Sequence, residues 1–146
     1  MNTKKQKILV SSCLLGEACR YDGKSKPCNE VIALAEKYTL IPVCAEVLGG
    51  LPTPRLPAEI VGERVLRCDG VDVTENYKRG AEAVLEVACQ NDIKIAILKS
   101  NSPSCSNKMI YDGTFSRTLT EGMGILAHLL KKNGILVLNE KEIQNL

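Results

Sequence analysis

The sequence predicts an α/β fold: a single three-layer Rossmann-like domain over residues 1–146, with a mostly parallel sheet, flanking helices and small hairpins. Three observations predict it. Short apolar runs bounded by turn residues are typical of strands that are buried on both faces. Amphipathic helical patterns lie between these runs, and strands that alternate with helices favour right-handed crossovers and a parallel sheet. No repeat, low-complexity tract or long linker divides the chain.

The elements follow in order along the chain. Four strands are expected, at Lys7–Ser11, Thr39–Val43, Ile95–Leu98 and Ile135–Leu138. The clearest helix is Thr74–Gln90, where Thr74 can cap the first turn and apolar residues recur at helical spacing. Shorter helices are expected at Asn29–Tyr38 and Met123–Lys132. Two hairpins are predicted, Glu59–Cys68 turning at Gly62-Glu63 and Met109–Arg117 turning at Asp112-Gly113.

Charge and composition exclude several classes of protein. The 19 basic and 17 acidic residues nearly balance, which is not typical of a dedicated nucleic-acid or membrane binder. Trp is absent and Phe115 is the only Phe, so a stacking platform for single-stranded nucleic acid is hard to assemble. After Met1–Lys7 the apolar run Ile8–Val10 is too short for a signal peptide or a membrane span. We expect a cytoplasmic protein with a small-molecule partner and no membrane.

Three of the seven cysteines follow predicted strands. Cys13, Cys44 and Cys105 come after the first, second and third strands, whose carboxyl ends share one edge of a parallel sheet. Three thiolates gathered there repel one another, whereas an iron-sulfur cluster or a zinc ion satisfies them and leaves one metal position open. The alternative is that these cysteines are small buried apolar residues at strand ends.

The other four cysteines have weaker positions. Cys89 extends the apolar face of the Thr74–Gln90 helix and is expected in the core, and Cys68 at the end of a hairpin strand is interpreted similarly. Cys19 and Cys28 follow Cys13 on a loop, so either is a candidate spare thiol in the same crevice. The only histidine, His128, lies in a predicted helix away from it, which argues against Cys-His chemistry.

Polar residues near the three cysteines each have two interpretations, one functional and one structural. Glu46 is a candidate for proton transfer beside a metal site, or else an ion-pair partner of Arg55 or a lysine. The loop from Ser100 to Cys105 offers hydroxyls around a thiol, or is simply a capped turn. The Gly- and Pro-rich segment 49–57 presents Arg55 to a substrate oxygen or phosphate, or is a rigid connection. Candidate substrate contacts are Ser12, Arg55 and Ser104.

Several stretches together resemble one family. In order along the chain they are Ser11-Ser12-Cys13-Leu14-Leu15-Gly16, Arg20-Tyr21-Asp22-Gly23, Val43-Cys44-Ala45-Glu46-Val47-Leu48-Gly49-Gly50, Pro52-Thr53-Pro54-Arg55, Pro57-Ala58-Glu59-Ile60, Ser102-Pro103-Ser104-Cys105 and Tyr111-Asp112-Gly113-Thr114-Phe115. The sequence resembles the thiouracil desulfidases, also known as domain of unknown function 523, over nearly its whole length.

The resemblance implies an enzyme that removes sulfur from thiolated pyrimidines. It implies a four-iron four-sulfur cluster held by Cys13, Cys44 and Cys105, with an open iron that polarises the thiocarbonyl while water attacks the carbon, without net redox change. It also implies that Glu46 transfers protons and that Ser102 orients water or substrate. Two alternatives stay open from the residues: a non-catalytic metal-cluster or sulfur-carrier module, and a cysteine-nucleophile hydrolase.

This sequence departs from the family pattern at two positions. Ala45 stands where proline is common, and Ser106 stands where glycine is common. A serine in the left-handed backbone region at position 106 would cost on the order of 1 kcal/mol and reshape the ligand loop. Within the family, longer relatives carry an additional domain and some relatives act on thiolated RNA, whereas this chain ends at Leu146 without such a domain. A free base, nucleoside or nucleotide is therefore expected as substrate, rather than folded RNA.

Overall fold

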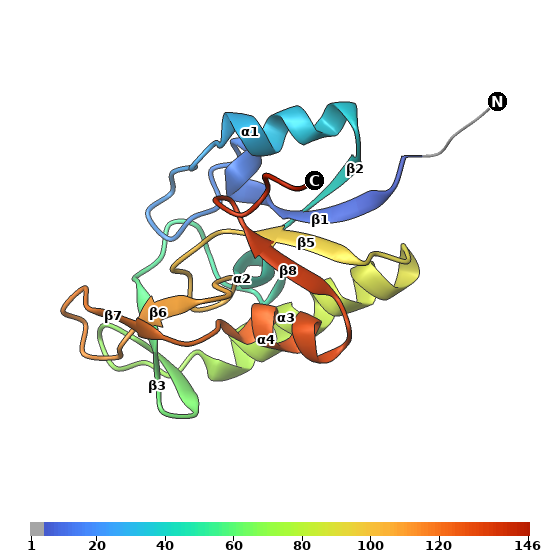
Figure 1. The fold of residues 1–146 in the computed structure, drawn as a ribbon. Coiled ribbons are helices and arrows are strands. Elements are labelled where there is room, and N and C mark those ends of the chain that lie inside the picture. The colour runs from blue at the N-terminus through green and yellow to red at the C-terminus, as the bar shows by residue number, and fades with distance from the viewer. Residues whose placement is uncertain (1–4) are drawn as a thin grey trace.

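A four-stranded parallel sheet organises the fold, which we analyse in a computed structural model describing residues 5–146. Its strands are β1 (Lys7–Ser11), β2 (Thr39–Val43), β5 (Ile95–Leu98) and β8 (Leu136–Asn139), in the order β2-β1-β5-β8 (Figure 1). The predicted α/β class is confirmed, and β8 begins one residue later than expected. Residues 1–4, at the start of the N-terminal segment for which no signal peptide is expected, lie outside the described residues.

The two central strands carry the core. Ile8, Leu9 and Val10 of β1 are fully buried, as are Ala96, Ile97 and Leu98 of β5. The edge strands differ: β2 is partly exposed along its length, and Leu136 at the start of β8 is 54% exposed. The expectation of strands buried on both faces is therefore wrong for β2 and β8, because an edge strand has a neighbour on one side only.

Helices cover both faces of this sheet (Figure 1). Leu9 and Ala96 pack in the core beneath α3 (Thr74–Gln90) and α4 (Ile125–Lys132). Ile8 and Ile97 face the opposite side, which α1 (Asn29–Ile32), the 3-10 helix η2 (Ala33–Glu36) and the 3-10 helix η1 (Ser12–Leu15) cover. Among residues 5–146 no helix is long and apolar enough to cross a membrane.

Two of the three predicted helices differ in detail, while α3 has the expected bounds. The segment expected as one helix from residue 29 to 38 is a turn of α-helix followed by a 3-10 turn. The last helix begins at Ile125, two residues later than expected, because Gly124 lies against the backbone of Ser104. A Cβ on Gly124 would lie 2.4 Å from the Ser104 carbonyl carbon.

Two small antiparallel hairpins lie beyond the carboxyl ends of the main strands (Figure 1). β3 (Ala58–Val61) and β4 (Arg64–Arg67) turn at Gly62-Glu63 as predicted. The second hairpin pairs β6 (Met109–Tyr111) with β7 (Leu119–Glu121). The predicted tight turn at Asp112-Gly113 is wrong, because the Asp112 N–H donates to the Thr118 carbonyl and closes a longer loop over residues 112–118.

The order of the strands creates a switch point between β1 and β5. From β1 the chain crosses one face of the sheet to reach β2, and from β2 it crosses the other face through α3 to reach β5. The loops that leave β1 and β5 therefore diverge at the carboxyl edge, which is where open α/β sheets bind ligands.

A short helix, α2 (Ala45–Leu48), sits directly on α3 without side chains between the two backbones. A Cβ on Gly80 would lie 1.8 Å from the Ala45 carbonyl oxygen, and one on Gly49 would lie 2.0 Å from the Asn76 carbonyl oxygen. The Asn76 side-chain amide also donates to the Gly49 carbonyl at 2.9 Å. These glycines fix the segment that follows β2 onto α3.

We expect Gly80→Ala to lower the free energy of unfolding by at least about 2 kcal/mol, since overpacking against rigid backbone outweighs the gain in helix propensity. Urea unfolding measures the change. The matched control is Glu82→Ala on the exposed face of the same helix, expected within about 0.5 kcal/mol of the unsubstituted protein. Equal stability of the two variants would contradict the close approach.

Candidate functional site

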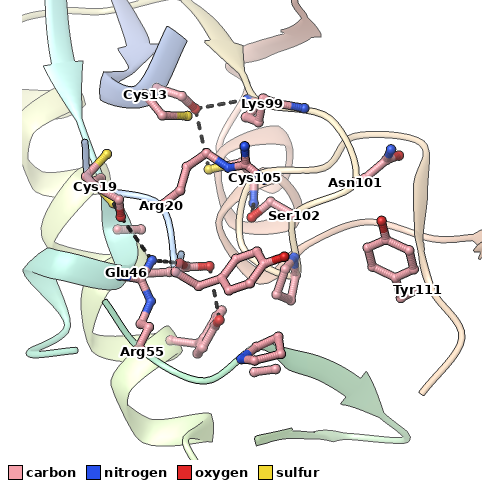
Figure 2. Close-up of a pocket in the computed structure, with 18 of the residues that line it drawn as sticks. Cys13, Cys19, Arg20, Glu46, Arg55, Lys99, Asn101, Ser102, Cys105 and Tyr111 are labelled. Carbon is pink, nitrogen blue, oxygen red and sulfur yellow. Dashed lines mark hydrogen bonds and ion pairs between the residues drawn. The ribbon is translucent and has the colours of Figure 1, made fainter. Parts of the chain in front are cut away.

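A cavity of about 430 Å³ opens at the carboxyl edge of the sheet (Figure 2). Its walls come from the segments that follow β1, β2 and β5 and from the two hairpins. Most of the site residues predicted from sequence line it, namely Ser12, Cys13, Cys44, Glu46, Arg55, Ser102 and Cys105. Ser104 is buried and does not belong to the lining.

Each of the three predicted ligand cysteines is positioned by the end of a strand. Cys13 lies in η1, which starts at the residue after β1. Cys44 follows the last residue of β2 and precedes the first residue of α2. Cys105 lies on the loop between β5 and β6. All three are free thiols at one cavity, and they come from three segments that are distant in sequence.

Burial and contact with neighbouring groups keep the thiols of Cys44 and Cys105 protonated. Burial raises the pKa of Cys105 to about 12, and this outweighs the stabilising hydrogen bond from Ser11. The hydrogen bond with Cys19, together with burial, raises the pKa of Cys44. Binding a metal or cluster here therefore displaces protons from thiols that are neutral near pH 7.

Cys19 is a fourth thiol at the same cavity. From the sequence, Cys19 and Cys28 are equal candidates for a spare thiol there. It is 7% exposed and lines the cavity. A hydrogen bond with the Cys13 thiol raises the pKa of Cys19 to about 11 despite an opposing hydrogen bond with Cys44. Cys28 is not part of the lining, and its thiol contacts the Glu30 carboxylate at 3.3 Å.

Two cysteines differ from their predicted environments. Cys89 was expected in the core but is exposed, because it falls on the edge of the apolar face of α3 near its end. Cys68 was also expected to be buried, yet it is exposed and lines the mouth of the cavity. It follows the last residue of β4, where the chain leaves the hairpin.

Ser11 joins the loops that leave β1 and β5. Its hydroxyl accepts the Lys99 N–H at 2.9 Å and donates to the Cys105 sulfur at 3.5 Å. The residue is 3% exposed. This single hydroxyl therefore spans the switch point and orients one thiol. Ser11 was not among the residues singled out from sequence, because a serine ending a strand has no distinctive pattern.

Ser102 caps a turn and also lines the cavity, so both interpretations of the loop, a capped turn and a source of hydroxyls at the site, apply. Its Oγ accepts the N–H groups of Ser104 and Cys105, each at 3.1 Å. These bonds fix the backbone that delivers Cys105. The Ser104 hydroxyl is buried without a hydrogen-bond partner among the described residues. Ser104 instead holds α4, since its carbonyl accepts from Leu126 and Ala127.

Both departures from the family pattern are accommodated locally. Ser106 is not in the left-handed region, so the strain expected there is absent among the described residues. It is 1% exposed, and its hydroxyl donates to the Met109 carbonyl. Ala45 is the first residue of α2. Proline is favoured at this position because the N–H that proline lacks has no acceptor within the helix, so alanine fits there as well.

Glu46 is held at both carboxylate oxygens. The Arg55 guanidinium pairs with Oε2, and the Tyr77 hydroxyl donates to Oε1 at 3.0 Å (Figure 2). Tyr77 comes from α3 and is 3% exposed, and burial together with the Glu46 charge raises its pKa. Tyr77 was missed as a site residue because its place on the apolar face of α3 is also typical of a core residue.

Both terminal nitrogens of the Arg55 guanidinium donate to protein acceptors. Besides Glu46 it donates to the Cys19 carbonyl at 3.2 Å and to the Pro52 carbonyl at 3.1 Å. Burial lowers its pKa, but the attraction of Glu46 outweighs this and the net shift is upward. Of the two readings given to Arg55, the structure supports the ion pair: the guanidinium joins the loop after β1 to the start of α2.

Basic side chains outnumber acidic ones around the cavity. Lys99 pairs with Glu140 at 3.1 Å, and the Ser100 N–H donates to the same carboxylate at 2.9 Å, which anchors the loop after β5 to the end of β8. Arg20, Lys26 and Arg117 also line the cavity, against the acidic residues Glu46 and Glu59. An uncharged or anionic ligand suits this environment better than a cation.

The donor set fits a cluster of several metal ions. Among residues 5–146, no group of three or more His, Cys, Asp or Glu side chains is close enough to hold a single metal ion. Cysteines that share an iron-sulfur cluster each bind a different iron, so their sulfurs stand farther apart than the ligands of one ion. Three free thiols around one cavity, without histidine, are the soft donors that such clusters use.

Comparison with known proteins gives consistent results. The sequence pattern of the 2-thiouracil desulfurase family matches residues 8–142. A Bacillus subtilis (strain 168) protein, YbbK, is 40% identical over 149 residues, covering 95% of this chain and 99% of its own. A solved structure described as the [4Fe-4S]-dependent thiouracil desulfidase TudS is 45% identical with a TM-score of 0.91, over 95% of this chain and 93% of that one.

Removing the partner of the partly buried carboxylate tests the arrangement around Glu46. In iron-free protein, we expect Arg55→Met to lower the free energy of unfolding by about 3 kcal/mol, because a largely desolvated charge is left unpaired. Tyr77→Phe removes one hydrogen bond and should cost about 1 kcal/mol. Adding Glu46→Gln to Arg55→Met should recover part of the loss in urea unfolding. A double variant no more stable than Arg55→Met would contradict the ion pair.

Proposed function

Because this chain belongs to the 2-thiouracil desulfurase family, we propose that it removes the sulfur of a thiolated pyrimidine by hydrolysis. Water replaces the thiocarbonyl sulfur, so the products are the oxo-pyrimidine and sulfide, and no electrons are exchanged with a donor. The observation that carries the proposal is one cavity lined by three thiols from the segments that follow β1, β2 and β5 and by the partly buried, ion-paired carboxylate of Glu46.

We propose that Cys13, Cys44 and Cys105 hold a four-iron four-sulfur cluster and leave one iron without a protein ligand. The support is their position at three strand ends around one cavity, together with the cluster named in the description of TudS. When bound, such a cluster supplies an open iron that acts as a Lewis acid toward the sulfur of the substrate. The Ser11 hydroxyl orients one of its ligands, through the hydrogen bond to Cys105.

Glu46 is the proposed general base and acid. It takes a proton from the attacking water and returns it to the leaving sulfur. Arg55 and Tyr77 hold its two oxygens, yet each carboxylate oxygen has a second lone pair that is free to accept from water. The ion pair therefore orients the carboxylate without using up its capacity as a base.

Ser102 is proposed to orient water or substrate. Its oxygen accepts two backbone N–H groups, which leaves its own proton to donate. In the proposal, this proton is donated to an oxygen or sulfur atom of the ligand in the cavity. Ser12 and Arg55 line the cavity and are proposed to contact the substrate. Ser104 is also a proposed contact, but its hydroxyl is buried outside the lining and must turn toward the cavity to reach the ligand.

The proposed substrate is a thiolated base, nucleoside or nucleotide. The basic residues around the cavity suit an uncharged or anionic molecule of this size. We propose that residues 1–146 act as one desulfidase domain in the cytoplasm, and we do not expect folded RNA to be the substrate.

Cysteine substitutions distinguish a cluster enzyme from a cysteine nucleophile. Separate Cys13→Ala, Cys44→Ala and Cys105→Ala variants, purified and reconstituted without oxygen, should each lose most bound iron and all conversion of thiouracil to uracil. Cys89→Ala on the exposed end of α3 is the matched control and should keep both. Loss of activity in one variant only, with iron retained in all, would favour the nucleophile instead.

Substitution of the carboxylate separates catalysis from metal binding. We expect Glu46→Gln to retain iron and the visible absorbance of the cluster while kcat falls about 10²- to 10⁴-fold, the usual loss when general acid-base catalysis is removed. Iron analysis and sulfide release measure the two properties. An unchanged kcat with full iron content would instead support a metal-cluster or sulfur-carrier module without catalysis.

A further inference from the structure

The outer wall of the cavity is built by the β6–β7 hairpin and its loop of residues 112–118. Tyr111, Phe115 and Arg117 from this hairpin line the cavity opposite the strand ends. Figure 2 shows Tyr111 beside Asn101 and Ser102 on this side of the pocket. The hairpin contributes none of the proposed cluster ligands and no proposed acid or base. The hairpin must therefore contribute to binding the other molecule in the cavity, the substrate.

One buried carboxylate fastens this loop to β3. Glu59 is 8% exposed, and its Oε1 accepts the N–H groups of Gly113 at 3.0 Å and Phe115 at 3.2 Å. Gly113 also lies so close to β3 that a Cβ there would be 2.8 Å from the Ile60 carbonyl oxygen. The loop is thus seated on the neighbouring hairpin at two points. A buried carboxylate that binds only backbone N–H groups of another element serves to place that element.

The loop is further braced from within. Asp112 Oδ1 accepts from both the N–H and the hydroxyl of Thr114, at 3.0 and 2.6 Å, and a chain of hydroxyl contacts continues through Ser116 to Thr118. These bonds support a left-handed backbone at Phe115, where φ is 59°. A bulky residue adopts that conformation only when the surroundings determine it.

The side chain held in this way is a free aromatic ring. Phe115 is 37% exposed and belongs to none of the apolar core clusters of the described residues. The other aromatic residues at the cavity have partners or places in a strand: Tyr77 binds Glu46, Tyr21 lies under the Arg20 guanidinium, and Tyr111 is paired in β6. Tyr21 is equally exposed, but its ring is already covered by a cation, whereas Phe115 is exposed without such a partner among the described residues, on a loop that another element fixes.

We propose that Phe115 contacts the substrate, its ring lying against the face of the pyrimidine, and that Glu59 is a positioning residue that holds Phe115 there. This inference rests on the proposed function for the class of substrate. A planar heterocycle that enters the cavity covers an exposed aromatic ring, and aromatic rings stack on bases of any sequence because each has a π-face. Phe115 then determines how tightly a pyrimidine is held, while Glu46 and the cysteines act on its sulfur.

The test compares Phe115→Ala with Phe115→Tyr in the cluster-loaded enzyme. Phe115→Ala should raise KM for thiouracil at least about fivefold with kcat within about twofold, since a contact made equally in the ground and transition states affects KM alone. Equilibrium dialysis with uracil should show the same loss of affinity without turnover. Phe115→Tyr keeps the ring and should bind like the unsubstituted enzyme. Unchanged dissociation constants for Phe115→Ala would overturn the proposal.

Leu119→Ala is the matched control. Leu119 lies in β7 of the same hairpin and is 40% exposed, but it does not line the cavity. Its substitution should leave the dissociation constant unchanged, and a loss as large as that of Phe115→Ala would refute a specific ring contact. If the unsubstituted loaded enzyme converts no thiouracil, the proposed function fails. If it converts thiouracil and Phe115→Ala binds uracil normally, only the present inference fails.

Glu59 variants test the positioning role. Glu59→Ala should speed amide hydrogen exchange across residues 112–118 and raise KM as much as Phe115→Ala, whereas Glu59→Gln keeps an acceptor oxygen and should largely restore both. In the double variant Glu59→Ala/Phe115→Ala, KM should rise no further than in either single variant, because the two residues act through one contact. Fully additive effects, or unchanged exchange in Glu59→Ala, would contradict this role.

Discussion

The contact between α2 and α3 is the constraint on which the site depends most. Two glycines, Gly49 and Gly80, let the backbones touch, so the segment after β2 has one position relative to the longest helix of the fold. Cys44 and Glu46 stand at the start of that segment, and Tyr77 stands three residues before Gly80. A thiol, a carboxylate and the hydroxyl that orients it therefore move together, and their geometry is set by main chain rather than by flexible side chains.

Further bonds connect this unit to the other walls of the cavity. Arg55 reaches from the proline-rich segment to Glu46 and to the Cys19 carbonyl, which ties the loop after β1 to α2. Ser11 links the ends of β1 and β5, and Glu140 anchors the start of the loop after β5 to β8. The cavity is open to ligand, yet the side that carries Glu46 and the cysteines is closely cross-linked. Such preorganisation keeps charge and thiols in place before any substrate arrives.

Sequence reasoning recovered the parts of the molecule that depend on local pattern. The bounds of β1, β2, β5 and α3 follow from apolar periodicity, and the parallel sheet then brought three strand-end cysteines to one cavity. The rest depends on contacts between distant segments. Tyr77 is indistinguishable from a core residue until Glu46 is seen beside it. The Asp112-Gly113 pair is typical of a tight turn until its own N–H groups are seen to donate to Thr118 and Glu59.

The cavity has two sides of different origin. Its inner side belongs to the main sheet, whereas its outer side is a hairpin that rests on β3 through Gly113 and Glu59. A surface loop tolerates insertion and exchange far better than a strand end beneath a buried core. Substitutions and insertions in this hairpin can therefore change the entrance of the pocket without disturbing the residues at the strand ends. The fold is built so that the choice of molecule and the reaction performed on it are free to evolve separately.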